Sequence, residues 1–134
     1  MDLVKIDGVV YDALVVALQE KASVEEGKNS GTSLYRKREI RDIEGIKYAH
    51  SITFARNDEA PELFDELFGY LFDNIRESVT LEVVHGQKTI SYEAAYSTGA
   101  RAVDYINDKT DFVGWGDLTV EFRSIETVIN PLGV

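Results

Sequence analysis

Apolar and polar residues alternate along most of this chain, and this pattern predicts a mainly β structure. The clearest run covers residues 46–55, where Tyr48, His50, Ile52 and Phe54 alternate with smaller or polar side chains. Residues two apart share one face of a strand, so the run predicts a strand with one buried face. The closing stretch 116–125 repeats the pattern and predicts a strand that turns its apolar side chains inward.

Turn residues separate the other predicted strands. Asp7-Gly8 favours a tight hairpin turn after the apolar run 3–6. His85-Gly86 joins two alternating runs in the same way, and 102–106 predicts one more short strand before a polar tip at 107–111. The stretch 9–24 is ambiguous, because Leu14 and Leu18 fit a helical spacing, whereas Leu14, Val16 and Leu18 also fit one face of a strand. Its β-branched residues favour the strand.

One segment carries a helical pattern. In residues 57–74, Asp58 is a candidate cap, Pro61 suits a first helical turn, and leucine and phenylalanine recur at i, i+4 spacing. The apolar stripe is wide enough to lie on a sheet. The order of elements therefore predicts an α+β fold that is mainly β with one packed helix at about 60–74. An antiparallel β-sandwich or barrel satisfies this order, and too few helices exist for a parallel sheet.

Composition narrows the class of protein. The 134 residues fit one domain, 1–134, and the formal net charge of −10 repels nucleic acid and anionic lipid. No Cys is present, so disulfides and thiolate metal sites are excluded. The first residues have no signal-peptide pattern and no apolar run reaches the length of a membrane span, so we expect synthesis and folding in a cytoplasm.

Catalytic motifs are lacking. His50 is expected to be a hydrogen-bonded core residue and His85 a turn residue, and no metal, cofactor or nucleophile signature occurs. We therefore predict no catalytic residues, no metal and no cofactor. Two alternatives remain. One is a carboxylate-dependent hydrolase, because acidic residues are abundant. The other is a small carbohydrate- or peptide-binding β module with Tyr96, Tyr105 and Trp115 as ligand-facing aromatics.

A long polar loop is expected at 26–45, and it collects the positive charge of an acidic chain. Its cations are Lys28, Arg36, Lys37, Arg38 and Arg41. Long loops are usually functional, and arginines can bind carboxylates of a neighbouring copy. Local pairing with Glu39, Asp42 and Glu44 is an equally simple explanation. Nucleic-acid binding is a third, but no basic and aromatic sheet face or recognition helix supports it.

The layout resembles tail structural proteins of long-tailed bacteriophages and prophages, of the tail-tube type. The strings that carry the resemblance are DLVKIDGVVYDALVV, RKREIRDIEG, IKYAHSITFARN, PELFDELFGYLFDN and GWGDLTVEFRSIE, in that order. Among these, the KIDGVVYD opening and the WGDLTVEF ending are the most informative. The Ala-rich second segment departs from the plan.

This resemblance implies a tail-tube-like fold and a non-enzymatic structural function. It implies self-assembly into rings or tubes, with the loop 26–45 contacting the next subunit and the chain's own copies and other tail proteins as partners. No nucleic acid or membrane is expected as a partner. The expected location is the virion tail, after assembly in the host bacterial cytoplasm.

Overall fold

The computed structural model describes residues 2–26, 31–32, 39–40, 43–57, 59–73 and 76–126. These residues form an eight-stranded sheet in the order β2-β1-β7-β8-β12-β6-β3, with β9 also paired to β12. Two further strand pairs, β10-β11 and β4-β5, lie outside it. The strands of the large sheet are β1 (Val4–Ile6), β2 (Val9–Val10), β3 (Val15–Glu26), β6 (Ile43–Phe54), β7 (Val79–His85), β8 (Lys88–Ala95), β9 (Gly99–Ala100) and β12 (Leu118–Ser124).

The remaining elements are β4 (Gly31–Thr32), β5 (Glu39–Ile40), β10 (Val103–Asn107), β11 (Phe112–Trp115), the helix α1 (Pro61–Phe72) and a 3₁₀ turn at Asp12–Leu14. Every strand pair among the described residues is antiparallel. The predicted antiparallel β architecture with one helix is therefore confirmed. The barrel alternative is wrong, because β2 and β3 end the sheet without pairing to each other.

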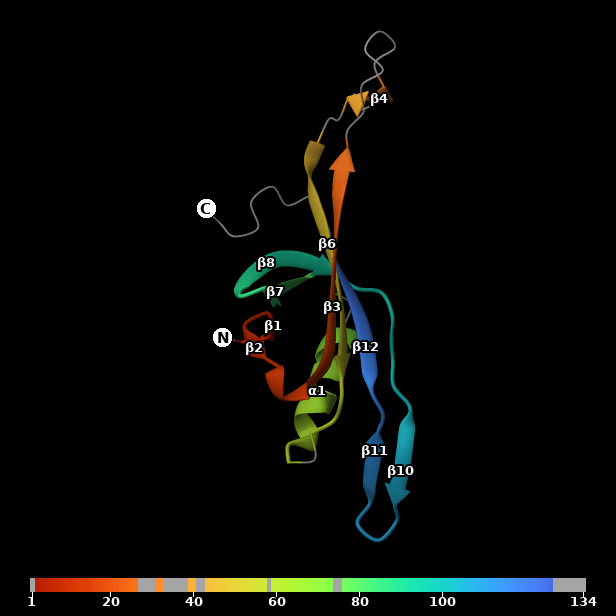
Figure 1. Ribbon diagram of the computed structural model, residues 1–134. Coiled ribbons are helices and arrows are strands. Elements are labelled where there is room, and N and C mark those ends of the chain that lie inside the picture. The colour runs from red at the N-terminus through yellow and green to blue at the C-terminus, as the bar shows by residue number, and fades with distance from the viewer. Residues whose placement is uncertain are drawn as a thin grey trace.

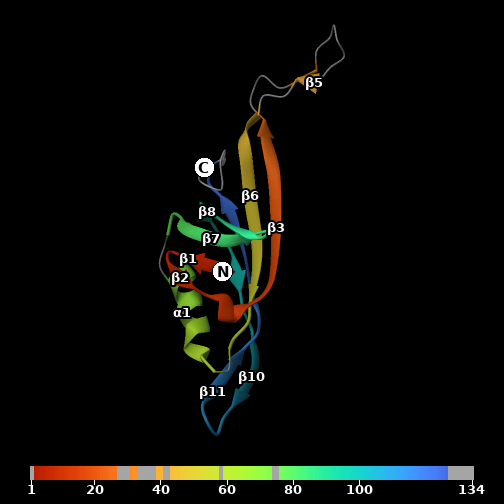
Figure 2. The same ribbon diagram turned by 60° about the vertical axis from the view of Figure 1, so that its left-hand side comes forward.

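The sheet folds over itself where β8 meets β12, a junction of only two paired residues on each strand. The strands β1, β7 and β8 consequently run across β3, β6 and β12, with α1 beside them (Figure 2). The enclosed space holds the core, which includes Ile52, Phe54, Leu67, Leu81 and Phe122, each at most 1% exposed. Alternation predicted these inward positions on β6 and β12.

Local chemistry explains the turns and the helix. Asp7 and Gly8 adopt positive φ angles of 48° and 88°, so the Asp7-Gly8 hairpin prediction is confirmed. In α1 the capping position is Ala60, which makes no side-chain cap, while Pro61 takes the first turn. The predicted cap, Asp58, lies outside the described residues. Phe64, Leu67 and Leu71 face the core.

Two predicted details change. The register of β3 shifts between Val15 and Ala17, so Val16 points outward and is 60% exposed, although Leu14 is buried as predicted. Such a bulge reverses the alternation that placed Leu14, Val16 and Leu18 on one face. The predicted loop also contains ordered β pairing, because β4 pairs with β5 and β6 already begins at Ile43.

Two hairpins project from the core in opposite directions (Figure 1). The β3-β6 pair, twelve residues on each strand, extends beyond the rest of the sheet at one end. The β10-β11 pair extends at the other end. The molecule is therefore elongated, with much of its strand surface outside the core.

Candidate assembly surfaces

The long β3-β6 hairpin is fixed to the core by a polar cluster of Glu20, His50, His85 and Tyr92. His50 lies on β6 at 0% exposure, between the Tyr92 hydroxyl, 2.6 Å from Nδ1, and a Glu20 carboxylate oxygen, 2.8 Å from Nε2. The same carboxylate accepts a bond from His85 Nδ1 at 2.8 Å. Four strands, β3, β6, β7 and β8, are thereby joined at one point.

Protonation states follow from these partners. Because a carboxylate only accepts, His50 Nε2 carries the proton that it donates to Glu20, and Nδ1 accepts from the Tyr92 hydroxyl. Burial lowers the pKa of His50 and outweighs the opposing effect of Glu20. The lowered pKa favours the neutral imidazole. Burial also raises the pKa of Tyr92, which keeps its phenol a donor. For Glu20, burial alone would raise the pKa, but bonds from His85 and His50 outweigh it and lower the pKa.

This cluster answers the predictions for both histidines. His50 is the hydrogen-bonded core residue that its position on the apolar face indicated. His85 ends β7 at the hairpin, but it also binds Glu20, which the sequence did not indicate. Glu20 was missed because its partners lie 30 and 65 positions away in the chain. Among the described residues, no three His, Asp or Glu side chains form a group that could hold a metal ion.

The strand β3 is a sheet edge. It pairs with β6 over residues 15–26 and has no second partner strand among the described residues. A long unpaired edge is a template for pairing with another chain. Charged and polar side chains along it, such as Lys21 and Gln19, are exposed.

Arg101 connects the β10-β11 hairpin to the helix α1. Its guanidinium lies 2.8 Å from Asp65 Oδ1 of α1, 4.3 Å from the centre of the Trp115 ring and 4.2 Å from that of Phe68. Arg56 adds a hydrogen bond of 2.6 Å to the Trp115 carbonyl oxygen. The base of the β10-β11 hairpin is therefore held rigidly against the body of the protein.

Three apolar side chains of this hairpin are exposed beside its polar tip. Ile106 and Val113 are direct cross-strand neighbours, at 62% and 41% exposure, and Val103 is 44% exposed. Neighbouring exposed apolar side chains on a projecting hairpin are typical of a contact surface.

Two of the three predicted ligand-facing aromatics, Tyr96 and Trp115, make contacts within the protein. The Tyr96 hydroxyl donates to the Leu71 carbonyl oxygen at 2.5 Å, and its ring contacts Phe72 and Phe122. Trp115 stacks with Arg101. The side chain of Tyr105 lies outside what the structure describes. A ligand-facing function for these aromatics stays a prediction.

The predicted subunit-contact loop carries five cations. Lys28, Arg36, Lys37, Arg38 and Arg41 all lie outside the described residues. Within the described residues, no helix has the length and apolarity that a bilayer span requires.

Comparison with solved structures identifies the fold. A chain in the tail of an empty gene transfer agent particle, solved with helical refinement and C6 symmetry, matches with a TM-score of 0.59 and 15% identity, over 93% of this chain and 91% of that one. A chain in the virion of the native gene transfer agent particle matches with a TM-score of 0.59 and 14% identity, over 95% and 92%. The sequence matches no protein-family model and no curated protein. The fold is thus similar to that of a chain in a gene transfer agent tail, and the resemblance to tail structural proteins is confirmed at the level of fold.

Proposed function

We propose that this chain is a non-enzymatic structural subunit of a phage or prophage tail, with a tail-tube-like sandwich fold. The observation that supports this most is the fold similarity to gene transfer agent tail and virion chains over more than nine-tenths of both chains. The subunit belongs to the virion tail and assembles in the cytoplasm of a bacterial host. Its partners are copies of itself and other tail proteins.

Assembly uses the surfaces that the core leaves uncovered. The β3 edge offers backbone groups along its length to a strand of a neighbouring copy. Ile106 and Val113 supply apolar contact area at the opposite end of the molecule. The cationic loop 26–45 binds carboxylates of the next copy, as the charge asymmetry of an acidic chain favours. Distinct surfaces at the two ends suit a head-to-tail ring or tube.

The test compares the mass and shape of the purified protein with those of variants. Light scattering and electron microscopy of the wild-type chain are expected to show rings or tubes. Reversing Arg36, Arg38 and Arg41 to Glu is expected to leave a folded monomer, because the loop then repels the neighbour. The matched control changes the same three to Lys and is expected to assemble. A wild-type chain that stays monomeric at every concentration contradicts the proposal, and unchanged assembly of the Glu variant removes the loop from it.

Ile106→Asp tests the second surface independently of the loop. The residue is 62% exposed, so the change leaves the core intact, while a buried carboxylate in an interface is strongly unfavourable. We expect the variant to fold normally by circular dichroism and to lose the higher assemblies. Ile106→Val is the control and is expected to assemble as the wild type does.

A further inference from the structure

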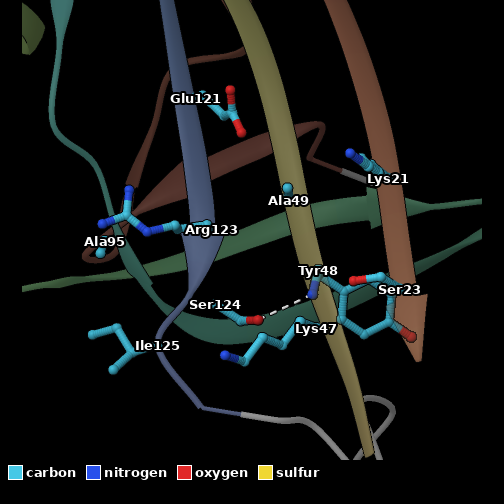
Figure 3. Close-up of a pocket in the computed structure, with 10 residues that line it drawn as sticks. All are labelled: Lys21, Ser23, Lys47, Tyr48, Ala49, Ala95, Glu121, Arg123, Ser124 and Ile125. Atoms are coloured by element: carbon cyan, nitrogen blue, oxygen red, sulfur yellow. Dashed lines mark hydrogen bonds between the residues drawn. The ribbon is translucent and has the colours of Figure 1, made fainter. Parts of the chain in front are cut away.

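A shallow hollow of about 420 Å³ lies on the outer face of the β3-β6-β12 layer, on the side away from the core (Figure 3). Three cations line it, Lys21 from β3, Lys47 from β6 and Arg123 from β12. A smaller hollow continues from it past Ser51 and Gln19. Both hollows adjoin the β3 edge, because Lys21 lines each of them, but they lie on the face of the strands rather than along the unpaired edge.

Strand register creates this arrangement. Lys21 and Arg123 both pair with Ala49, so the two cations stand on either side of one small side chain. Adjacent strands lie about 4.8 Å apart, which places the two backbones roughly 10 Å from each other. Lys47 is two residues from Ala49 on the same face of β6. The result is a cationic groove, formed by Lys21, Lys47 and Arg123, with Ala49 as its floor.

The three cations of the groove form no ion pair with acidic side chains of the described residues. Within the described part of the chain, Lys5, Arg56 and Arg101 each form ion pairs, whereas Lys21, Lys47 and Arg123 form none. Glu121 also lines the groove, but no ion pair joins it to any of the three in the described part of the chain. Three cations against one carboxylate among the lining residues give this face a local positive charge, on a chain with a net charge of −10, and that favours an anionic partner.

We propose that the cationic groove docks the acidic face of α1 from a second copy of this chain. The helix contains Glu62, Asp65 and Glu66 and no Lys or Arg. Asp65 already binds Arg101, but Glu62 and Glu66 are exposed and form no ion pair in the described structure. Their i, i+4 spacing places the two residues on one face of the helix, with Cβ atoms about 5–6 Å apart, so both carboxylates can meet the long groove side chains.

The positions of the two surfaces favour contact between copies over contact within one. Ile52 and Phe54 of β6 belong to the same buried core cluster as the inward residues of α1, so the helix covers the inner face of this layer. The groove occupies the outer face. Complementary surfaces that face opposite ways generate a head-to-tail contact, which closes into a ring or continues as a helix. The inference rests on the proposed self-assembly and names one of its contacts.

A charge-swap experiment tests this pairing. One variant carries Lys21→Glu and Arg123→Glu, and a second carries Glu62→Lys and Glu66→Lys. Each alone is expected to lose at least tenfold in its high-mass fraction by size exclusion with light scattering, because the contact becomes repulsive. An equal mixture of the two is expected to recover complexes, since each groove then meets a partner of opposite sign. Circular dichroism checks the fold, and Lys21→Ala with Arg123→Ala serves if the reversed variant does not fold.

The control is Lys88→Glu, which reverses an exposed cation at the β7-β8 hairpin, outside the proposed assembly surfaces, and is expected to assemble normally. The inference is overturned if the groove variant assembles like the wild type, or if mixing restores nothing. It is also overturned if nuclease treatment dissolves the wild-type assemblies, since the occupant is then a nucleic acid. A wild-type chain that never assembles refutes the proposed function itself, which separates the two failures.

Discussion

Tyr92→Phe removes one hydroxyl group and leaves the Nδ1 atom of His50 without a donor. His50 is 0% exposed, so water cannot replace the lost bond, which is 2.6 Å long in the intact protein. A buried polar atom without a partner costs about 1–3 kcal/mol. The Phe ring preserves the stacking against His50, whose ring centre is 5.6 Å away, so the hydrogen bond is the main loss.

This free energy is measurable by thermal and urea unfolding. Unfolding entropy is about 2.1 cal/mol/K per residue, or roughly 0.28 kcal/mol/K for this chain, so the melting temperature should fall by about 4–11 °C. The midpoint in urea should fall while the m-value stays constant.

Tyr48→Phe is the matched control. Tyr48 stacks in the same aromatic row, 6.2 Å from Tyr92 between ring centres. Its hydroxyl makes no hydrogen bond within the described residues and reaches solvent, because no buried side-chain polar atom there lacks a partner. We expect its unfolding free energy to stay within about 0.5 kcal/mol of the wild type. Equal stability of Tyr92→Phe and Tyr48→Phe would refute the assignment of the Tyr92 hydroxyl as the donor to His50.

Three further predictions concern the pH dependence and the packing. Because the pKa of His50 is lowered in the folded state, its contribution to the unfolding free energy is complete above about pH 6.5 and is lost as the pH falls towards the lowered pKa. The unfolding free energy of His50→Gln should therefore fall less between pH 7 and 5.5 than that of the wild type. An equal pH dependence of the two proteins would contradict this. Gly99→Ala places a Cβ 2.5 Å from Phe72 Cζ, so we expect a loss of about 1–3 kcal/mol in urea unfolding, and unchanged stability would show that the ring moves freely. Arg101→Ala removes the cation beside Trp115, and we expect a red-shifted emission of this single Trp and a loss of about 1–2 kcal/mol; an unchanged spectrum argues against the stacked geometry.

Alternation predicted the parts of the fold that depend on burial within one strand. Leu118, Val120 and Phe122 are all buried on β12, as a period of two requires. The Asp7-Gly8 turn was equally predictable, because few dipeptides tolerate two positive φ angles in succession. Local signals of this kind do not predict where the sheet bends over the core, because the bend depends on the short pairing between β12 and β8, which are distant in the sequence.

The groups that join distant strands were not predictable for the same reason. In the sequence, Glu20 is one of 24 acidic residues and Lys21 one of 14 basic residues. Only the strand register shows that Glu20 pairs with His50 and that Lys21 lies across Ala49 from Arg123. Bulges add a second obstacle, because the shift near Val16 reverses a face without a sequence signature. The sequence therefore predicted the helix and the strands better than it predicted which strands and side chains lie next to one another.

Glu20 is the point at which hydrogen bonds hold β3 to the core, and the strand extends beyond this point. Six residues separate Glu20 from the end of β3 at Glu26, a span of roughly 20 Å at about 3.3 Å per residue. A pivot of about 5° at the anchor moves that far end by nearly 2 Å, which is more than a hydrogen bond tolerates. The hydrogen bonds of one carboxylate to two imidazoles thus limit how far the outer end of this hairpin can move relative to the core.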